Sequence, residues 1–197
     1  MDQRNSFFTY TLKVPWGRTS FIFDEHGTLI EIKLNSLLSI GEKGKKSKKI
    51  PALKVIRKWI CAYLNGDQKD FPGEWLIPGT TKFQKNVYLA TLSILPGEVS
   101  TYGEIAIKAG SPKATRAVGS CMAKNPLPLI IPCHRIVSAG GGLGGFSGGG
   151  LPVKIALLKS EKCCYLSITQ GNNPKKYGEG ATNPPLSNTH SFRVAHN

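Results

Sequence analysis

Residues 101–124, with the sequence TYGEIAIKAGSPKATRAVGSCMAK, predict two short helices joined by a tight turn. Thr101 and Glu104 have the spacing of a capping box at the start of the first helix, and Gly110 follows its expected end. A second helix is expected over residues 113–124. Two short helices joined by a glycine-containing turn are typical of a helix-turn-helix motif, which places one helix on DNA.

The second of these helices is unusually rich in small side chains: Ala114, Ala117, Gly119, Ser120 and Ala123. One interpretation is close packing of this helix inside the fold, and the pattern alone favours it, because small residues are common on helices. The other interpretation is that the helix enters the minor groove of DNA, which is only about 6 Å wide and does not admit ordinary helices.

The flanking sequence predicts the rest of an α+β fold. Short runs in residues 7–35 alternate apolar and polar side chains, which indicates an antiparallel sheet, and an amphipathic helix follows from Pro51. Thr81 and Gln84 form a capping box at the start of a further helix, and a glycine-rich loop over 140–150 precedes the last helix. We expect a small N-terminal antiparallel sheet domain with a helix, followed by a mainly helical C-terminal domain with a winged helix-turn-helix-like motif.

Composition divides the chain into four parts. We expect an N-terminal domain over residues 1–70, a linker rich in glycine and proline over 71–79, and a C-terminal domain over 80–169. The run CCYLSI near the end of that domain is a candidate closing strand. Residues 170–197 are polar and rich in glycine and proline, which predicts a disordered tail.

The chain is strongly basic, with 26 lysines and arginines against 12 acidic residues and a formal net charge of +14. This excess favours an anionic partner, foremost DNA, with RNA, an acidic protein or an anionic membrane surface as alternatives. Five lysines lie in residues 43–49, which predict a solvated loop, with a nuclear targeting signal or a DNA contact as alternatives. No apolar run approaches the roughly 20 residues of a membrane span, and the N-terminus is a poor signal peptide.

The five cysteines do not indicate a disulfide framework, because their number is odd and their spacing scattered. We expect them to be reduced. Residues 1–60 contain no cysteine and only His26, and no C-x-x-C spacing occurs, so no zinc or other metal is expected.

One cysteine has neighbours that suit a nucleophile, because Cys133 is followed by His134 in the run IPCHRIV. The thiolate is the reactive form of cysteine, and a base and nearby cations promote it. Adjacent side chains point in different directions, so a water could carry the proton between the two, and Glu161 is a candidate to orient the imidazole. Taken singly, the alternatives are a small buried apolar cysteine and a buried, hydrogen-bonded histidine.

The run PCHR (132–135) resembles the acceptor motif of the O6-alkylguanine-DNA alkyltransferases, also called methylated-DNA–protein-cysteine methyltransferases. Further segments occur in that family's order and at near-family spacing: GEVSTYGEIA (97–106), SPKATRAVG (111–119), NPLPLIIPCHRIV (125–137), GGFSGGG (144–150) and PVKIALLKSE (152–161). The resemblance covers about residues 72–168 closely and residues 1–71 only in outline.

The resemblance implies that Cys133 accepts an alkyl group irreversibly, with a water, His134 and Glu161 completing a proton relay. Tyr102 would donate a proton or hydrogen bond to the departing guanine ring, and Lys154 would support that end of the pocket. No cofactor is implied, and each molecule would react once.

Three further residues of the substrate pocket follow from the resemblance. Asn125 would tie the recognition helix to the active-site segment, and the backbone N–H of Ser147 would lie near guanine O6. Phe146 stands where a tyrosine is frequent in the family, and this difference would alter the preferred alkyl size.

The implied partner is double-stranded alkylated DNA, bound through its minor groove by the slim helix. Arg116 would insert into the base stack and hold the damaged nucleotide outward, because the target atom is inaccessible inside a duplex. Tyr102 would also face the DNA, and Gln84, Gly103 and Ser111 would contact phosphates from helix starts. An ordinary helix cap is the alternative role for Ser111.

The predicted function is direct reversal of DNA damage at O6-alkylguanine, with O4-alkylthymine as a second candidate substrate. The free protein is expected to be a monomer, away from membranes, in the nucleus or, for a prokaryotic source, in the cytoplasm. Two alternatives are a DNA-binding module without transfer and a cysteine hydrolase. Alkyltransferase-like proteins, which represent the first alternative, keep the family's fold but lack the acceptor cysteine that this chain has. A hydrolase would leave the groove helix and Arg116 without a purpose.

Overall fold

The N-terminal part of the chain forms a four-stranded antiparallel sheet in a computed structural model that describes residues 7–67, 69–77 and 80–162. The strand order is β3-β2-β1-β4, with bounds Phe8–Val14 (β1), Gly17–Phe23 (β2), Leu29–Lys33 (β3) and Gly41–Lys43 (β4). β1 and β2 form a hairpin in which Val14 pairs with Gly17. The three strands predicted from alternating side chains are confirmed.

The prediction of a solvated loop over residues 43–49 is wrong at its first residue, because Lys43 belongs to strand β4. Its three residues pair with residues 9–11 of β1 and include Lys43. The backbone of the sheet edge gains partners here, an effect of tertiary context that a run of lysines does not reveal. Lys46 then lies 5.1 Å from the ring centre of Tyr10, so part of the run rests on the sheet.

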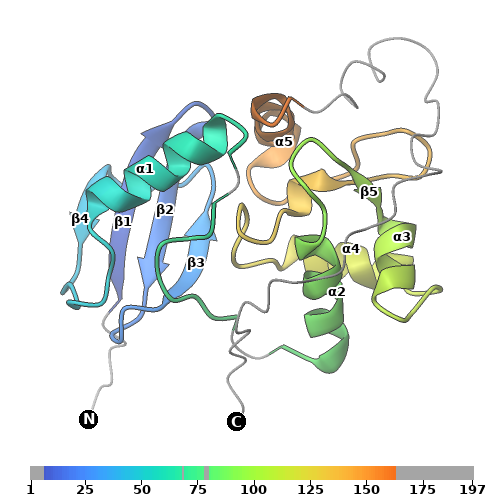
Figure 1. The fold of residues 1–197 in the computed structure, drawn as a ribbon, viewed down its shortest axis with the longest axis horizontal. Coiled ribbons are helices and arrows are strands. Elements are labelled where there is room, and N and C mark those ends of the chain that lie inside the picture. Colours follow the sequence, from blue (N-terminus) through green and yellow to red (C-terminus); the bar gives the residue numbers. More distant parts are fainter. Residues whose placement is uncertain (1–6, 68, 78–79, 163–197) are drawn as a thin grey trace.

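Helix α1, Leu53–Leu64, crosses one face of this sheet (Figure 1). Its buried side chains are Ile56, Trp59, Ile60 and Tyr63. The Trp59 ring meets Phe21 of β2 edge-on, with 6.2 Å between ring centroids. Burial of one such side chain contributes roughly 1.5–3 kcal/mol, so this face holds the helix to the sheet. The amphipathic helix predicted after Pro51 is confirmed.

The segment after α1 runs along the edge of β3. Phe71 and Ile77 are buried, and Leu29 of β3 forms a parallel bridge with Trp75. The backbone N–H of Leu29 donates to the carbonyl of Glu74 at 2.9 Å. The described residues of the expected linker are therefore packed against the sheet. The division of the chain into separate domains stays a prediction.

The C-terminal part consists of helices and a short parallel sheet. Its elements are α2 (Lys82–Leu92), β5 (Ser100–Thr101), α3 (Tyr102–Lys108), α4 (Thr115–Ala123), a 3-10 helix (Cys133–Arg135), β6 (Ile136–Val137) and α5 (Gly150–Ser160). Helices α2, α3 and α4 pack against one another, and α5 also contacts α1. Figure 1 shows α5 between α1 and the other three helices.

Both predicted capping boxes are present, Thr81 with Gln84 in α2 and Thr101 with Glu104 in α3. Helix α4 begins two residues later than predicted, because a turn closed by the N–H of Ala114 on the carbonyl at position 111 comes first. Helix α5 begins at Gly150, the last residue of the predicted glycine-rich loop.

One hydrophobic core extends from Phe8 in β1 to Leu157 in α5 and so joins both halves of the chain. Across the described ranges, no helix is both long and apolar enough to cross a membrane. The candidate strand CCYLSI and the predicted tail over 170–197 lie outside the described residues.

Candidate active site

The residues Cys133–Arg135 form a single 3-10 turn directly before β6. All three side chains are buried. The segment that leads to them is irregular and contains three prolines, and Leu129 within it has a positive φ of 78°. β6 pairs with β5, which joins directly to α3. This pairing places the cysteine turn beside the first residues of α3.

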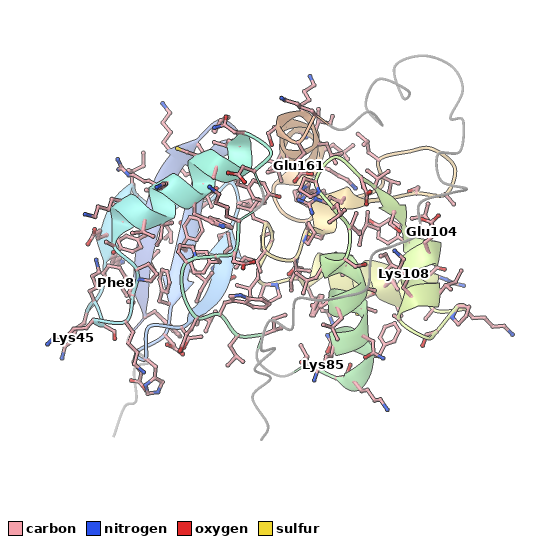
Figure 2. All side chains as sticks on the ribbon, in the orientation of Figure 1. Phe8, Lys45, Lys85, Glu104, Lys108 and Glu161 are labelled. Atoms are coloured by element: carbon pink, nitrogen blue, oxygen red, sulfur yellow. The ribbon has the colours of Figure 1, made fainter. Side chains whose placement is uncertain are left out.

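Glu161, which caps the C-terminal end of α5, contacts both residues that follow the cysteine. Nε2 of His134 lies 2.9 Å from Oε1 of Glu161. Arg135 donates from Nε to Oε2 at 3.0 Å and from Nη2 to Oε1 at 2.8 Å, a two-pronged ion pair. Figure 2 shows Glu161 beside α5, at the junction between the sheet and the helical half. The structure therefore brings together the His134–Glu161 pair predicted from sequence.

The carboxylate of Glu161 is charged although it is buried. Burial by itself raises its pKa, but hydrogen bonds from His134 and Arg135 outweigh burial and hold the pKa at about 2. The pKa of His134 is lowered, because burial disfavours its charged form more than Glu161 favours it. The imidazole is therefore neutral near neutral pH, and its proton lies on Nε2, which faces the carboxylate.

The other ring nitrogen of His134 is free to accept a proton. Nδ1 is buried and has no hydrogen-bond partner among the described residues. In a neutral imidazole with its proton on Nε2, Nδ1 carries an unshared electron pair. This arrangement makes His134 a candidate general base at the position that follows Cys133, with the carboxylate of Glu161 at the other ring nitrogen.

Burial raises the pKa of the Cys133 thiol. The side chain of Asn125, the charge of Lys154 and nearby backbone N–H groups favour the thiolate, but they do not offset burial. Lys154 does lower this pKa, as expected of a neighbouring cation, but burial raises it by more. The resting side chain is a neutral thiol, which needs a base before it can act as a nucleophile.

A pocket of about 230 Å³ opens onto the cysteine. Its lining residues are Tyr102, Gly119, Met122, Ala123, Cys133, Gly145, Phe146 and Ser147. The volume is below the roughly 300–1,000 Å³ of pockets for drug-sized ligands, and it suits a group the size of one nucleobase. Four of the predicted site residues therefore meet around one small cavity.

Asn125 and Lys154 act as ties between backbone segments around this pocket. The Asn125 amide donates to the carbonyl of Ile131 at 2.9 Å and accepts from the N–H of Leu127 at 3.0 Å. Lys154 is buried and donates to the carbonyls of Ile136 and Leu143. Burial lowers the Lys154 pKa to about 8, against an opposing effect of the cysteine. These contacts hold the cysteine turn to the end of α4 and to the glycine-rich loop.

The small side chains of α4 do not form its packed face. The buried residues of this helix are Val118, Cys121 and Met122. The small residues are half-buried or exposed, and Gly119 and Ala123 line the pocket. The interpretation that small residues allow close packing within the fold is therefore wrong for α4, because larger apolar residues occupy that face.

Arg116 is exposed on the same helix. The other predicted DNA contacts lie at or near the starts of different helices. Gln84 and Gly103 are in the first turns of α2 and α3, and the Gln84 backbone N–H donates to Thr81 Oγ1 at 3.2 Å. Ser111 is the first residue of the turn that precedes α4, and the N-cap of α4 is Ala114. Ser111 is thus not the cap of this helix.

Comparison with known proteins identifies the chain. A methylated-DNA–protein-cysteine methyltransferase of Haemophilus influenzae is 41% identical over 141 residues, which cover 70% of this chain and 78% of that protein. The chain belongs to this methyltransferase family. Residues 82–163 also match the family described as 6-O-methylguanine DNA methyltransferase, DNA binding domain.

Solved structures of the methyltransferase family share the fold. The O6-methylguanine methyltransferase of Mycobacterium tuberculosis has a TM-score of 0.64 and 33% identity, and covers 79% of this chain and 93% of its own. The same organism's protein in complex with DNA has a TM-score of 0.62 and 33% identity, and covers 78% and 92%.

Two further residues of this candidate site do not follow from the sequence analysis. Arg135 holds Glu161, and the hydroxyl of Tyr63 donates to Glu161 Oε1 at 2.9 Å. Arg135 is part of the acceptor run, and a buried carboxylate needs a cation. The pairing of Arg135 with Glu161 could therefore have been inferred from the sequence. Tyr63 gave no signal, because it occupies an apolar position of α1 that predicts only core packing. Within the described ranges, no group of three or more His, Cys, Asp or Glu side chains could hold a metal ion.

Proposed function

We propose that this protein repairs alkylated DNA by moving the alkyl group of O6-alkylguanine onto Sγ of Cys133. The observation that carries the proposal is a thiol in the wall of a nucleobase-sized pocket, next to the neutral, carboxylate-held His134. The names of the relatives support the same activity.

In the proposed reaction, a water carries the thiol proton of Cys133 to Nδ1 of His134. The sulfur then attacks the alkyl carbon, so that a sulfur–carbon bond forms and the bond from that carbon to guanine O6 breaks. The electron pair stays on guanine, which takes the hydroxyl proton of Tyr102 as it leaves, and solvent returns a proton to the Tyr102 oxygen while the thiol proton stays on His134. The Glu161 charge stabilises the imidazolium while it carries the proton.

The remaining pocket residues position the substrate. The backbone N–H of Ser147 faces O6, Phe146 limits the size of the alkyl group, and Lys154 and Asn125 keep the cavity walls in place. The product is a thioether, which has no leaving group that these side chains could displace. The protein therefore acts once and needs no cofactor.

DNA enters, in this proposal, along α4 in a winged helix-turn-helix-like domain formed with α3. The exposed small residues of α4 allow it to approach the floor of the minor groove. Arg116 fills the space left by the extruded nucleotide, since unstacking a base costs a few kcal/mol that new contacts must offset. Backbone contacts near Gln84, Gly103 and Ser111 hold the phosphates.

O4-alkylthymine is a second candidate substrate, because it presents the same alkyl–oxygen bond on a base that fits a cavity sized for guanine. We also propose that the free protein is a monomer. Its bacterial and archaeal relatives favour the cytoplasm of a prokaryote over the nucleus as its location.

A labelled O6-benzylguanine tests the proposed transfer. Folded protein should become labelled in a stoichiometric amount, and Cys133→Ala should abolish the label while Cys121→Ala, at a buried cysteine outside the pocket lining, keeps it. Label that survives Cys133→Ala would exclude the proposal. A module that only binds DNA would show no label at all, and a hydrolase would show turnover beyond one equivalent.

A further inference from the structure

Helix α1 of the N-terminal half reaches the catalytic cluster through Tyr63. This residue lies 98 positions before Glu161 in sequence, yet its hydroxyl donates to Glu161 Oε1 at 2.9 Å. The same hydroxyl oxygen lies 3.2 Å from Nε2 of His134. The two rings are arranged edge-on, with 6.3 Å between centroids. Tyr63 thus touches both partners of the predicted relay but lies outside the residues that line the pocket.

We propose that Tyr63 is a positioning residue for alkyl transfer, whose hydroxyl holds His134 with its proton on Nε2 and its free Nδ1 toward Cys133. This inference rests on the proposed transfer reaction and extends it by giving the N-terminal half a part in the chemistry. It assigns no contact between Tyr63 and the substrate.

The hydrogen bonds around Glu161 Oε1 carry the argument. This one oxygen receives three donors, from Tyr63, His134 and Arg135. Because the Tyr63 proton is directed to the carboxylate, the Tyr63 oxygen presents a lone pair to Nε2 of His134. A proton on Nε2 is then favoured by two acceptors, the Tyr63 oxygen and Glu161 Oε1. An unprotonated Nε2 would instead face the lone pairs of both oxygens. The cluster therefore selects one tautomer of the neutral ring.

The hydroxyl is also kept as a permanent donor. Tyr63 is buried, and burial followed by the charge of Glu161 raises its pKa well above the ordinary value. Tyr63 therefore keeps its proton throughout the range in which His134 titrates. A phenylalanine would fill the same space against Trp59 of α1 without this polar group, so packing alone does not require the hydroxyl.

Several charged or titratable groups face His134 and set its proton affinity. Glu161 at the end of α5 favours the imidazolium, and Arg135 and Lys154 disfavour it. The Tyr63 hydroxyl acts through Glu161, because it withdraws part of the carboxylate's charge from the histidine. Its removal leaves a stronger acceptor opposite Nε2, so the His134 pKa should rise.

The test compares full-length wild type with Tyr63→Phe across a range of pH, using alkylation by O6-benzylguanine. The variant should keep its alkaline rate within about threefold, whereas its rate on the acidic side should fall roughly tenfold, because more His134 is protonated there. Tyr10→Phe is the matched control, since it removes a buried hydroxyl that donates to the carbonyl of Pro51 at 3.2 Å, far from the cluster. The control should follow the wild-type pH profile. Identical profiles for all three proteins would overturn the inference.

Nitrogen NMR of the His134 ring provides a readout that does not depend on transfer, with His134→Gln used to assign its signals. Wild type should show a protonated Nε2 and an unprotonated Nδ1, and in Tyr63→Phe the pKa of His134 should be raised, because Glu161 stays 2.9 Å from Nε2 as a stronger acceptor. If Tyr63→Phe does not fold, 3-fluorotyrosine at position 63 keeps the hydroxyl and makes it a stronger donor. It should then shift the acidic limb of the rate profile toward lower pH, and an unmoved limb would contradict the inference. Wild type that takes no label would instead refute the proposed transfer, while the NMR result still tests the tautomer.

Discussion

Arg135 and Glu161 form a buried, two-pronged ion pair, with Nε–Oε2 and Nη2–Oε1 distances of 3.0 and 2.8 Å. Each side chain is only about 1% exposed. Oε1 of Glu161 also lies 2.9 Å from Nε2 of His134. The same carboxylate therefore stabilises the fold and orients the predicted base. Removing one member of such a pair leaves an uncompensated buried charge.

Glu161→Gln should therefore destabilise the protein by about 3–5 kcal/mol, because Arg135 stays charged and buried but loses its ion pair with Glu161. Urea unfolding followed by fluorescence measures this loss. Glu31→Gln is the control, because its ion pair with Lys33 is well exposed and should contribute at most about 1 kcal/mol. Equal losses in the two variants would contradict the role assigned to the buried pair.

Stability should fall in two steps as the solution is acidified. The folded-state pKa of His134 is lowered, so the unfolded chain takes up its proton first and stability declines below the ordinary value of 6.5. The pKa of Glu161 is about 2 instead of 4.5, so its contribution is full above 4.5 and is lost as pH falls toward 2. That second step amounts to roughly 3 kcal/mol in wild type. Urea titrations at a series of pH values should show that Glu161→Gln lacks the second step.

Arg116→Ala should slow repair of duplex DNA by about 10- to 100-fold, because a few kcal/mol of unstacking are then no longer offset. Reaction with free O6-benzylguanine should be unchanged within about twofold, since no base has to leave a stack. Lys58→Ala, on the exposed face of α1, is the charge-matched control and should leave the ratio of the two rates unchanged. Equal losses on both substrates would refute a base-flipping role for Arg116.

Phe146→Ala should widen the pocket and favour bulky alkyl groups. The benzyl-to-methyl ratio of transfer rates should rise about tenfold, since one fitted apolar group discriminates by about 1–3 kcal/mol. Competition between the two substrates on the same duplex measures the ratio directly. An unchanged ratio would show that the phenyl ring does not limit the size of the alkyl group.

The sequence around α4 predicts its helical structure but not which of its sides is buried. Thr101, Glu104 and Gly110 predict the helices and the turn, because capping and turn chemistry act within a few residues. The pattern of small residues does not tell which side of α4 is buried, and it favoured packing. In the structure, Val118 and Met122 occupy the buried side instead.

The candidate site also contains residues that the sequence indicates and one that it does not. Cys133, His134 and Glu161 were recognisable from the acceptor run and the spacing of the last helix. Tyr63 enters the cluster only because α1 packs against α5, and no local pattern in α1 indicates that contact. The net direction of the Cys133 pKa also required the structure, because it depends on burial as well as on nearby charge.

The most direct test of the central claim is an intact mass spectrum of the protein after incubation with a duplex that contains O6-methylguanine, followed by peptide mapping. We predict the mass of one added methyl group per chain and its location on Cys133, with guanine restored in the DNA. An unmodified mass with restored DNA, or a methyl group on any other residue, would contradict the account.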